Sequence, residues 1–223
     1  MTESIVDRLR QIDTCAVSDA LDALELKGTV IGIKPISVLR RVAGLVQTVK
    51  LGPASEPASD NLPKVHLCSA AVDAAEPGDV IVVENHARED AAGWGGILST
   101  AAAHKGLSAT IVDGPVRDAD ESREVDYPVF ARSAIPFTAR GRIAEHAWNI
   151  PVEIGGVIVN PGDLVLADGS GVVFVDQKRA EDIVAKAEEI AAKEAAMAAA
   201  VRQGKKVSDV MGGDYEDMLA KKD

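Results

Sequence analysis

Two side chains with distinct chemistry stand next to each other at the end of the run DGPVRD, residues 113–118. The run follows an apolar segment, and ligands of open α/β sheets usually bind just past the carboxyl ends of strands. Arg117 offers a planar guanidinium that can bind a carboxylate, and Asp118 offers the hard oxygen ligands that Mg²⁺ or Mn²⁺ takes. These residues indicate a site for a small acid and a divalent cation. A helix-capping aspartate with a surface ion pair is the alternative.

A glycine-rich turn, GWGG at residues 93–96, precedes the apolar pair Ile97 and Leu98. Backbone N–H groups at the start of a helix have no partner within the helix, so they can bind an anion. Gly95 and Gly96 would let a ligand approach the backbone closely. Neither GxxxxGK[ST] nor GxGxxG occurs, which disfavours a nucleotide, and a small carboxylate suits the turn as well as a phosphate. A tight turn around a core tryptophan is the alternative.

Glu194 is the third candidate, in the long alanine-rich segment that follows Arg179. Ile183, Ala187 and Ile190 recur at spacings that place them on one face of a helix, and Glu194 continues that face. Burial of an unpaired carboxylate is costly, so Glu194 there needs a partner or a wet cleft. Alternatively, the apolar stripe ends one turn earlier and Glu194 is solvated.

Other common chemistries find no support in the sequence. The histidines are His66, His86, His104 and His146. None of them forms an HExxH motif or a pair four residues apart, so we do not expect a histidine metal centre. The two cysteines, Cys15 and Cys68, are far apart, which argues against a disulfide scaffold or a cysteine zinc site and indicates a cytoplasmic protein. No GxSxG nucleophile motif is present.

The elements that must position these residues alternate between helix and strand. Apolar spacing predicts two short helices between Ser4 and Leu26, because Asp13-Thr14 interrupts the spacing and offers a cap. A helix from about Ala91 to Lys105 and a long helix from Arg179 to Arg202 are also expected. Runs of β-branched residues predict strands at residues 42–49, 80–83, 109–112, 129–131, 151–159, 164–167 and 171–175. Residues 52–63, with three prolines, are expected to form a surface loop. The pattern predicts a mixed α/β fold.

The length of 223 residues, 47 % of them apolar, suits one compact domain at residues 1–203 with a polar tail at residues 204–223. Lys and Arg total 24 against 35 Asp and Glu, a formal net charge of -11. This balance disfavours a protein that binds nucleic acid by neutralising phosphates. No apolar run is long enough to cross a membrane, and the first residues do not resemble a secretory leader.

The chain resembles the class II 4-hydroxy-4-methyl-2-oxoglutarate aldolases, a family that also contains the regulator of ribonuclease E activity A. The resemblance covers about residues 4–202 and is specific in the combination of the glycine turn with DGxxRD. The residues that carry it are VSDALD at 17–22, VAG at 42–44, GGIL at 95–98, IVDGPVRD at 111–118, YPVFAR at 127–132, PVEIGG at 151–156 and PGD at 161–163.

The resemblance implies a single-domain β/β/α swivelling-type fold that assembles into trimers or hexamers with sites between subunits. In the family's aldolases the arginine of DGxxRD binds the pyruvyl group and the aspartate anchors a divalent metal, which here means Arg117 and Asp118. The helix-start amides that hold the substrate carboxylate would be those of Ile97 and Leu98, beside Gly95 and Gly96. Glu194 best matches a glutamate that reaches in from the neighbouring subunit.

We therefore expect a lyase dependent on Mg²⁺ or Mn²⁺ that cleaves 4-hydroxy-2-oxo acids, decarboxylates oxaloacetate, or does both. Both reactions pass through the enolate of pyruvate, which Arg117 would stabilise. Glu194 or a metal-ordered water would transfer protons.

One position departs from the family pattern. The aldolases commonly carry an acid where this chain has Gly96. Two alternatives follow: a protein-binding regulator of an RNA-degrading enzyme, or a related lyase or dehydratase that acts on another hydroxy acid. The family's regulators tend to lose the Arg-Asp pair, and its presence here favours an enzyme.

Overall fold

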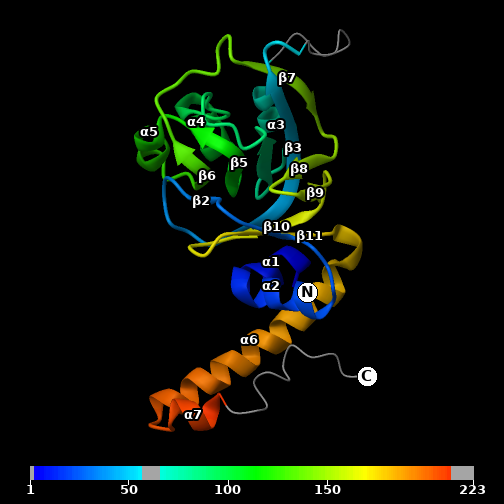
Figure 1. The fold of residues 1–223 in the computed structure, drawn as a ribbon, viewed down its shortest axis with the longest axis vertical. Coiled ribbons are helices and arrows are strands. Elements are labelled where there is room, and N and C mark those ends of the chain that lie inside the picture. Colours follow the sequence, from blue (N-terminus) through cyan, green and yellow to red (C-terminus); the bar gives the residue numbers. More distant parts are fainter. Residues whose placement is uncertain (1–2, 57–65, 212–223) are drawn as a thin grey trace.

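A curled sheet of nine strands runs through the computed structural model, which describes residues 3–56 and 66–211 (Figure 1). Its order is β1-β11-β10-β3-β4-β5-β6-β2, with β7 paired to the far half of β3. The strands of this sheet are β1 (Thr29–Val30), β2 (Lys34–Pro35), β3 (Val42–Pro53), β4 (Val80–Glu84), β5 (Ala109–Val116), β6 (Val129–Ala134), β7 (Ile143–Trp148), β10 (Leu164–Ala167) and β11 (Val172–Val175). A separate hairpin pairs β8 (Val152–Ile154) with β9 (Val157–Val159).

The long strand β3 joins two differently paired halves of the sheet. Its first residues pair antiparallel with β10, as Leu45 does with Leu164, and its next residues pair parallel with β4, as Val46 does with Val80. Strands β3 to β6 are parallel, and β4 and β5 are buried along their whole length. Burial on both faces is typical of parallel strands covered by helices.

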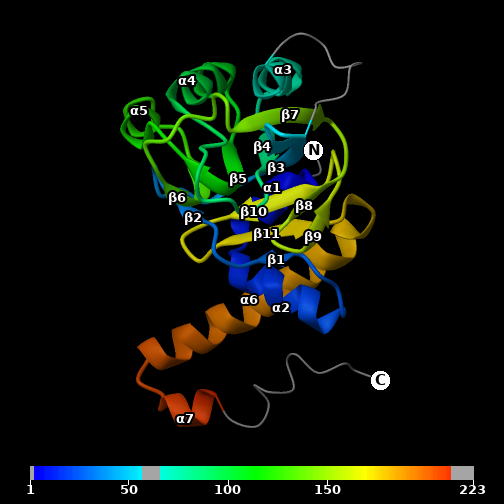
Figure 2. The same ribbon diagram turned by 45° about the horizontal axis from the view of Figure 1, so that its top comes forward.

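Helices cover both ends of this sheet (Figures 1 and 2). The helices are α1 (Ile5–Gln11), α2 (Thr14–Ala23), α3 (Leu67–Ala74), α4 (Gly96–Lys105), α5 (Ala119–Glu124), α6 (Ala180–Arg202) and α7 (Val207–Val210), with a 3₁₀ turn at Gln177–Arg179. The first two helices and α6 pack on the β10–β11 side, whereas α3 and α4 pack against the parallel strands. The distal part of α6 projects away from the body of the protein (Figure 2). No helix among the described residues is long and apolar enough to span a membrane.

The predicted fold class is confirmed, a mixed α/β domain with N-terminal helices and a long C-terminal helix. The break between the two N-terminal helices is also where predicted, because the Asp13 side chain caps α2 by accepting from the Ala16 N–H. Part of the predicted loop at residues 52–63 is wrong, since Gly52 and Pro53 continue β3, and residues 57–63 lie outside the described residues. In the predicted tail, α7 is helical and residues 212–223 lie outside the described residues.

Two predicted boundaries near the site are wrong for the same physical reason. The helix expected from Ala91 begins only at Gly96, and the strand expected to end at Val112 continues to Val116. The backbone before the helix bonds to the end of β5 instead: the Gly93 N–H donates to the Pro115 carbonyl at 2.9 Å. Tertiary pairing therefore overrides the local helix propensity of this segment.

Asp168, in the turn between β10 and β11, ties α2 to the sheet. The side chain accepts from the Thr14 N–H at 3.0 Å, the Thr14 hydroxyl at 2.7 Å and the Ser170 N–H at 2.9 Å. Burial opposes ionisation of Asp168, but these hydrogen bonds and the nearby Arg41 outweigh it and lower its pKa below the ordinary value of 3.8. The ionised carboxylate therefore stabilises the folded state.

We expect Asp168→Asn to lower the free energy of unfolding by about 2 kcal/mol near neutral pH, because hydrogen bonds to a charged acceptor are lost. The pKa of Asp168 is lower in the folded protein than in the unfolded chain. Its contribution to stability is therefore fully present at a pH above the unfolded-state pKa, and it is lost as the pH falls through the folded-state pKa. Urea unfolding at neutral and strongly acidic pH measures this, with the exposed cap variant Asp176→Asn as control. An equal loss at both pH values would contradict the prediction.

Candidate active site

A cavity of about 550 Å³ opens where the end of β5, the start of α4, the start of α3 and β7 meet. Six of the residues singled out from the sequence line it: Gly95, Gly96, Ile97, Leu98, Arg117 and Asp118. Arg117 immediately follows β5, and its N–H donates to the Trp94 carbonyl at 3.0 Å, which fastens the glycine turn against this strand. The chain thus brings the two separate sequence motifs to one place.

Asp118 has a backbone conformation that positions its carboxylate across the cavity. Its φ of 54° is in the left-handed region, and its side chain does not cap α5, the helix that it precedes. One oxygen, Oδ2, instead accepts from the Gly96 N–H at 3.0 Å and from Arg117 Nε at 3.1 Å. The capping interpretation thus holds for this oxygen, although the capped helix is α4.

The remaining groups of the site point to binding of an anion and a cation. Within the described residues, no group donates to Oδ1 of Asp118, and no group accepts from the N–H of Ile97 or Leu98. Free amides at the start of the ten-residue helix α4 are suited to a carboxylate. The adjacent Arg117, 41 % exposed, adds a positive charge beside them.

The donor set fits a largely hydrated Mg²⁺ or Mn²⁺ ion. Such ions are commonly bound through one or two carboxylates and otherwise keep water or substrate oxygens. Asp118 provides one carboxylate with an available oxygen, and the cavity has room for waters beside it. Among the described residues, Asp118 belongs to no group of three or more His, Cys, Asp or Glu side chains that could enclose an ion.

Gly96 has an acidic neighbour that the sequence did not reveal. A Cβ atom built on Gly96 would lie 3.1 Å from both Cβ and Oε2 of Glu121, a residue of α5. It would also lie 3.2 Å from Cβ of Asp118. The space that a side chain at position 96 would enter is therefore bordered by the carboxylate of Glu121.

A buried chain of hydrogen bonds supports the glycine turn from behind. Trp94 Nε1 donates to the Ser99 hydroxyl at 2.9 Å, and Ser99 pairs with Ser122 at 2.8 Å. The Ser122 hydroxyl in turn donates to the Asp118 carbonyl at 3.3 Å. Trp94 is 3 % exposed, so the interpretation of a core tryptophan is confirmed alongside the open amides.

We expect Ser99→Ala to lower the free energy of unfolding by about 1–3 kcal/mol, because the buried Trp94 N–H loses its acceptor. Thr100→Ala, at the exposed next position, is the matched control. It should lower the free energy of unfolding by less than half as much as Ser99→Ala. Urea denaturation followed by tryptophan fluorescence measures both. A loss in Thr100→Ala as large as that in Ser99→Ala would contradict this role of the buried chain.

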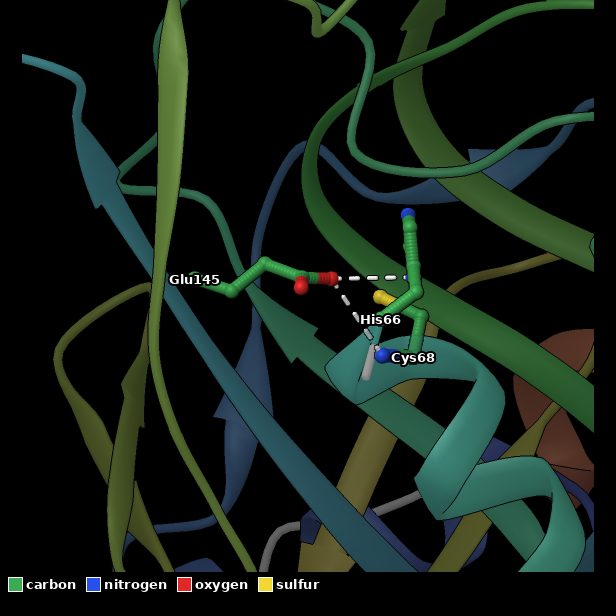
Figure 3. Close-up of side chains that lie close together, drawn as sticks. All are labelled: His66, Cys68 and Glu145. Atoms are coloured by element: carbon green, nitrogen blue, oxygen red, sulfur yellow. Dashed lines mark hydrogen bonds and ion pairs between the residues drawn. The ribbon is translucent and has the colours of Figure 1, made fainter. Parts of the chain in front are cut away.

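Three further side chains line the cavity, and the sequence analysis did not assign them to a site (Figure 3). His66 precedes α3, Cys68 is its second residue, and Glu145 lies on β7. Glu145 Oε1 lies 2.9 Å from His66 Nδ1, and Oε2 accepts from the Leu67 N–H at 2.8 Å. The sequence did not indicate a metal site at these residues, but the structure brings their potential ligand atoms within 4.8 Å of one another.

The charges of this cluster are coupled. The hydrogen bond to Glu145 raises the pKa of His66, against a smaller opposing effect of burial. Burial opposes ionisation of Glu145, but His66 and the backbone N–H groups of α3 together lower its pKa. Burial, and then the charge of Glu145, raise the pKa of the Cys68 thiol. No sequence spacing could have revealed the cluster, because Glu145 comes from a distant strand.

Glu194 does not line this cavity; it belongs to α6, a helix drawn at the opposite end of the protein from α3 and α4 in Figure 1. The stripe predicted for α6 is confirmed, since Ile183, Ala187 and Ile190 are buried. Burial, and then the charges of Asp13 and Asp19, raise the pKa of Glu194. A role for Glu194 at the cavity would therefore require a second copy of the chain.

Comparison with known proteins assigns a family to this arrangement. The family model described as "RraA-like: Aldolase/RraA" matches residues 14–174. The chain belongs to the RraA-like family. This family contains both aldolases and RraA proteins, which agrees with the resemblance carried by DGxxRD and the glycine turn.

Individual relatives carry different names. The chain is 33 % identical to a "Putative 4-hydroxy-4-methyl-2-oxoglutarate aldolase" of Halalkalibacterium halodurans, over 82 % of this chain and 81 % of that protein. It is 29 % identical to "Protein DlpA" of Legionella pneumophila over 82 % of this chain, but it spans only 29 % of that protein. A solved structure of an uncharacterized Pseudomonas syringae protein aligns with a TM-score of 0.82 at 30 % identity and covers 95 % of this chain and 98 % of that one.

A second solved structure represents the regulatory names in the family. It is described as Streptomyces coelicolor RraAS2, "an unusual member of the RNase ES inhibitor RraA protein family". The TM-score is 0.72 at 26 % identity, with 85 % of this chain and 92 % of that chain covered. Relatives of this chain thus carry both catalytic and regulatory names.

Proposed function

We propose that this protein is a divalent-metal-dependent carbon–carbon lyase that acts on small 2-oxo acids. The supporting observation is the convergence of Arg117, Asp118 and the amides of Ile97 and Leu98 on one cavity. The reactions proposed are decarboxylation of oxaloacetate and retro-aldol cleavage of 4-hydroxy-2-oxo acids. The aldolase names of several relatives support the same choice.

Different residues of the cavity have different roles in such a reaction. The amides of Ile97 and Leu98 hold the carboxylate next to the 2-oxo group, and Arg117 holds the pyruvyl oxygens. The exposed Arg140 also lines the cavity, and this additional positive charge favours dicarboxylic substrates. Mg²⁺ or Mn²⁺, held by Asp118, supplies Lewis-acid polarisation of the 2-oxo group when bound.

In oxaloacetate the bond between C3 and C4 breaks, carbon dioxide leaves, and the electron pair remains on the pyruvyl fragment as an enolate. The guanidinium of Arg117 stabilises the negative charge that develops on the enolate oxygen. Protonation at C3 then gives pyruvate. In retro-aldol cleavage the C4 hydroxyl loses its proton as the same bond breaks, so the same enolate forms.

Proton transfer in the aldol reaction requires an acid or base near the cavity. We propose that Glu121 orders water beside Gly96, since its carboxylate borders the space of the missing side chain. Glu194 would be the second such group, contributed by a neighbouring copy in a trimer or hexamer.

The assay for this proposal is pyruvate release by the purified protein from oxaloacetate and from 4-hydroxy-4-methyl-2-oxoglutarate. Each substrate is tested with Mg²⁺, with Mn²⁺ and with EDTA, for the wild type and Asp118→Ala. Metal-dependent pyruvate that disappears in the variant supports the lyase. Absence of pyruvate under all conditions would overturn it and would favour a different hydroxy acid.

Shared sites make a specific prediction for mixed oligomers. Each proposed site combines Asp118 of one copy with Glu194 of the neighbouring copy. Asp118→Ala and Glu194→Gln should therefore each be inactive alone, because each variant lacks one of these two groups in every site. When equal amounts are dissociated and reassembled together, about a quarter of the sites should recover both halves, given random cyclic assembly. Activity of the reassembled mixture measures this, and no recovery beyond that of the separate variants would contradict a cross-subunit role for Glu194.

The second candidate function is that of a protein-binding regulator of an RNA-degrading enzyme, which the likeness to RraAS2 favours. An acidic protein of net charge -11 could bind a basic surface of an RNA-degrading enzyme. This reading predicts that Asp118→Ala leaves partner binding unchanged. Pull-down of ribonuclease E by wild type and variant alike, together with no pyruvate release, would favour it.

A further inference from the structure

We propose that His66, Cys68 and Glu145 form a binding site for a soft divalent transition metal such as Zn²⁺. The imidazole, thiol and carboxylate ligand atoms lie within 4.8 Å of one another (Figure 3). The site is distinct from the hard-cation position at Asp118, although both open into the same cavity.

The backbone holds these three ligands close to the spacing that a metal needs. His66 and Cys68 flank the first residue of α3, and Glu145 of β7 lies opposite them (Figure 3). Glu145 is anchored by accepting from the Leu67 N–H at 2.8 Å and the Cys68 N–H at 3.4 Å. A carboxylate has about four acceptor positions, so it can keep these bonds and still bind a cation.

The distance between the nitrogen and the oxygen ligand suits a tetrahedral ion after a small adjustment. Nitrogen and oxygen ligands at about 2.0–2.1 Å from a tetrahedral ion lie about 3.3 Å apart. Glu145 Oε1 and His66 Nδ1 are 2.9 Å apart in the structure, as a hydrogen-bonded pair. The His66 side chain is 59 % exposed and can turn by this small amount, whereas the buried Cys68 is fixed by the packing of α3.

The chemistry of the donors selects the class of metal. Thiolate and imidazole favour Zn²⁺ and related transition metals, whereas Mg²⁺ requires oxygen ligands. Three protein ligands leave a fourth position that faces the cavity, as in catalytic zinc sites. Binding forms a bond between the metal and Sγ of Cys68, and the thiol proton passes to solvent.

The test uses Co²⁺ as a coloured substitute for Zn²⁺ on the full-length protein, in the presence of excess Mg²⁺. We expect one Co²⁺ ion per chain, with intense visible bands typical of a tetrahedral site and a sulfur-to-cobalt charge-transfer band in the near ultraviolet. Zn²⁺ should displace the colour. Absence of the charge-transfer band at saturating Co²⁺ would overturn the proposal.

Variants assign the band to these residues. Cys68→Ser should abolish the charge-transfer band, and Glu145→Gln should weaken Co²⁺ binding about tenfold or more. Cys15→Ser, which changes the exposed cysteine, is the matched control and should keep the band. A band that survives in Cys68→Ser, or disappears in Cys15→Ser, would contradict the assignment. His66→Gln, at an exposed position, should weaken binding without endangering the fold.

The proposed metal site and the proposed lyase activity can be tested independently of each other. The cobalt spectrum requires no turnover, and Asp118→Ala should leave it unchanged. A normal spectrum with no pyruvate release would overturn only the proposed reaction. Metal-dependent pyruvate release with no sulfur–cobalt band would overturn only the second metal site.

Discussion

Replacing Arg117 with alanine is expected to lower kcat/KM for pyruvate release about a thousandfold, as removal of a transition-state charge stabiliser does. Arg117 contributes the positive charge beside the free amides of α4, and it holds Asp118 through a contact of 3.1 Å. Removal would therefore affect both the proposed enolate stabilisation and the position of the carboxylate proposed to bind the metal. Stability should change little, because the side chain is 41 % exposed.

Arg179 provides a matched control for this variant. Its Nε lies 3.1 Å from Asp182 Oδ2, and its side chain is 43 % exposed, so its pairing closely resembles that of Arg117. Arg179→Ala should retain the full rate of pyruvate release in the same assay. Equal rates for Arg117→Ala and Arg179→Ala would exclude a role for Arg117 in the reaction.

The second large effect is expected from Gly95→Ala, a change of a single methyl group. A Cβ at this position would lie 2.8 Å from Asp118 Oδ2, so this carboxylate must move, and it would lie 3.4 Å from Arg117 Nε, an ordinary contact. Gly95 has an extended backbone, with φ of -157°, which alanine adopts readily. Activity should fall about a hundredfold, because misplacement by about 1 Å is sufficient for that loss.

Gly169→Ala is the comparison for that variant, since the added Cβ there would meet only Leu39 Cδ1 at an ordinary 3.4 Å. Both variants should have midpoints of thermal unfolding close to that of the wild type. Gly169→Ala should also keep its activity. Gly95→Ala with full activity would mean that the position of Asp118 Oδ2 does not limit the reaction.

Local signals predicted much of the fold and one part of the site. The Asp13 cap and the buried stripe of α6 both depend on neighbours within a few residues. DGPVRD and the turn could be placed together from sequence only through the family resemblance. Periodicity does not state which strand end meets which helix start.

Long-range geometry accounts for what the sequence could not reveal. Glu145 approaches His66 because β7 folds back antiparallel onto the end of β3, a pairing with no local signature. Likewise, Glu121 borders the space beside Gly96 only because α5 packs against α4. The segment before α4 is extended for the same reason, since β5 takes its hydrogen bonds.

The most direct test of the central claim is exchange of the methyl protons of pyruvate with deuterated water, followed by proton NMR. The same enolate must form in this direction, and no assumption about the natural substrate is needed. With Mg²⁺ or Mn²⁺ we predict that the wild type accelerates loss of the methyl signal, and that Asp118→Ala and Arg117→Ala do not. Exchange no faster than in buffer containing the metal alone would contradict an enolate-forming site at Arg117 and Asp118.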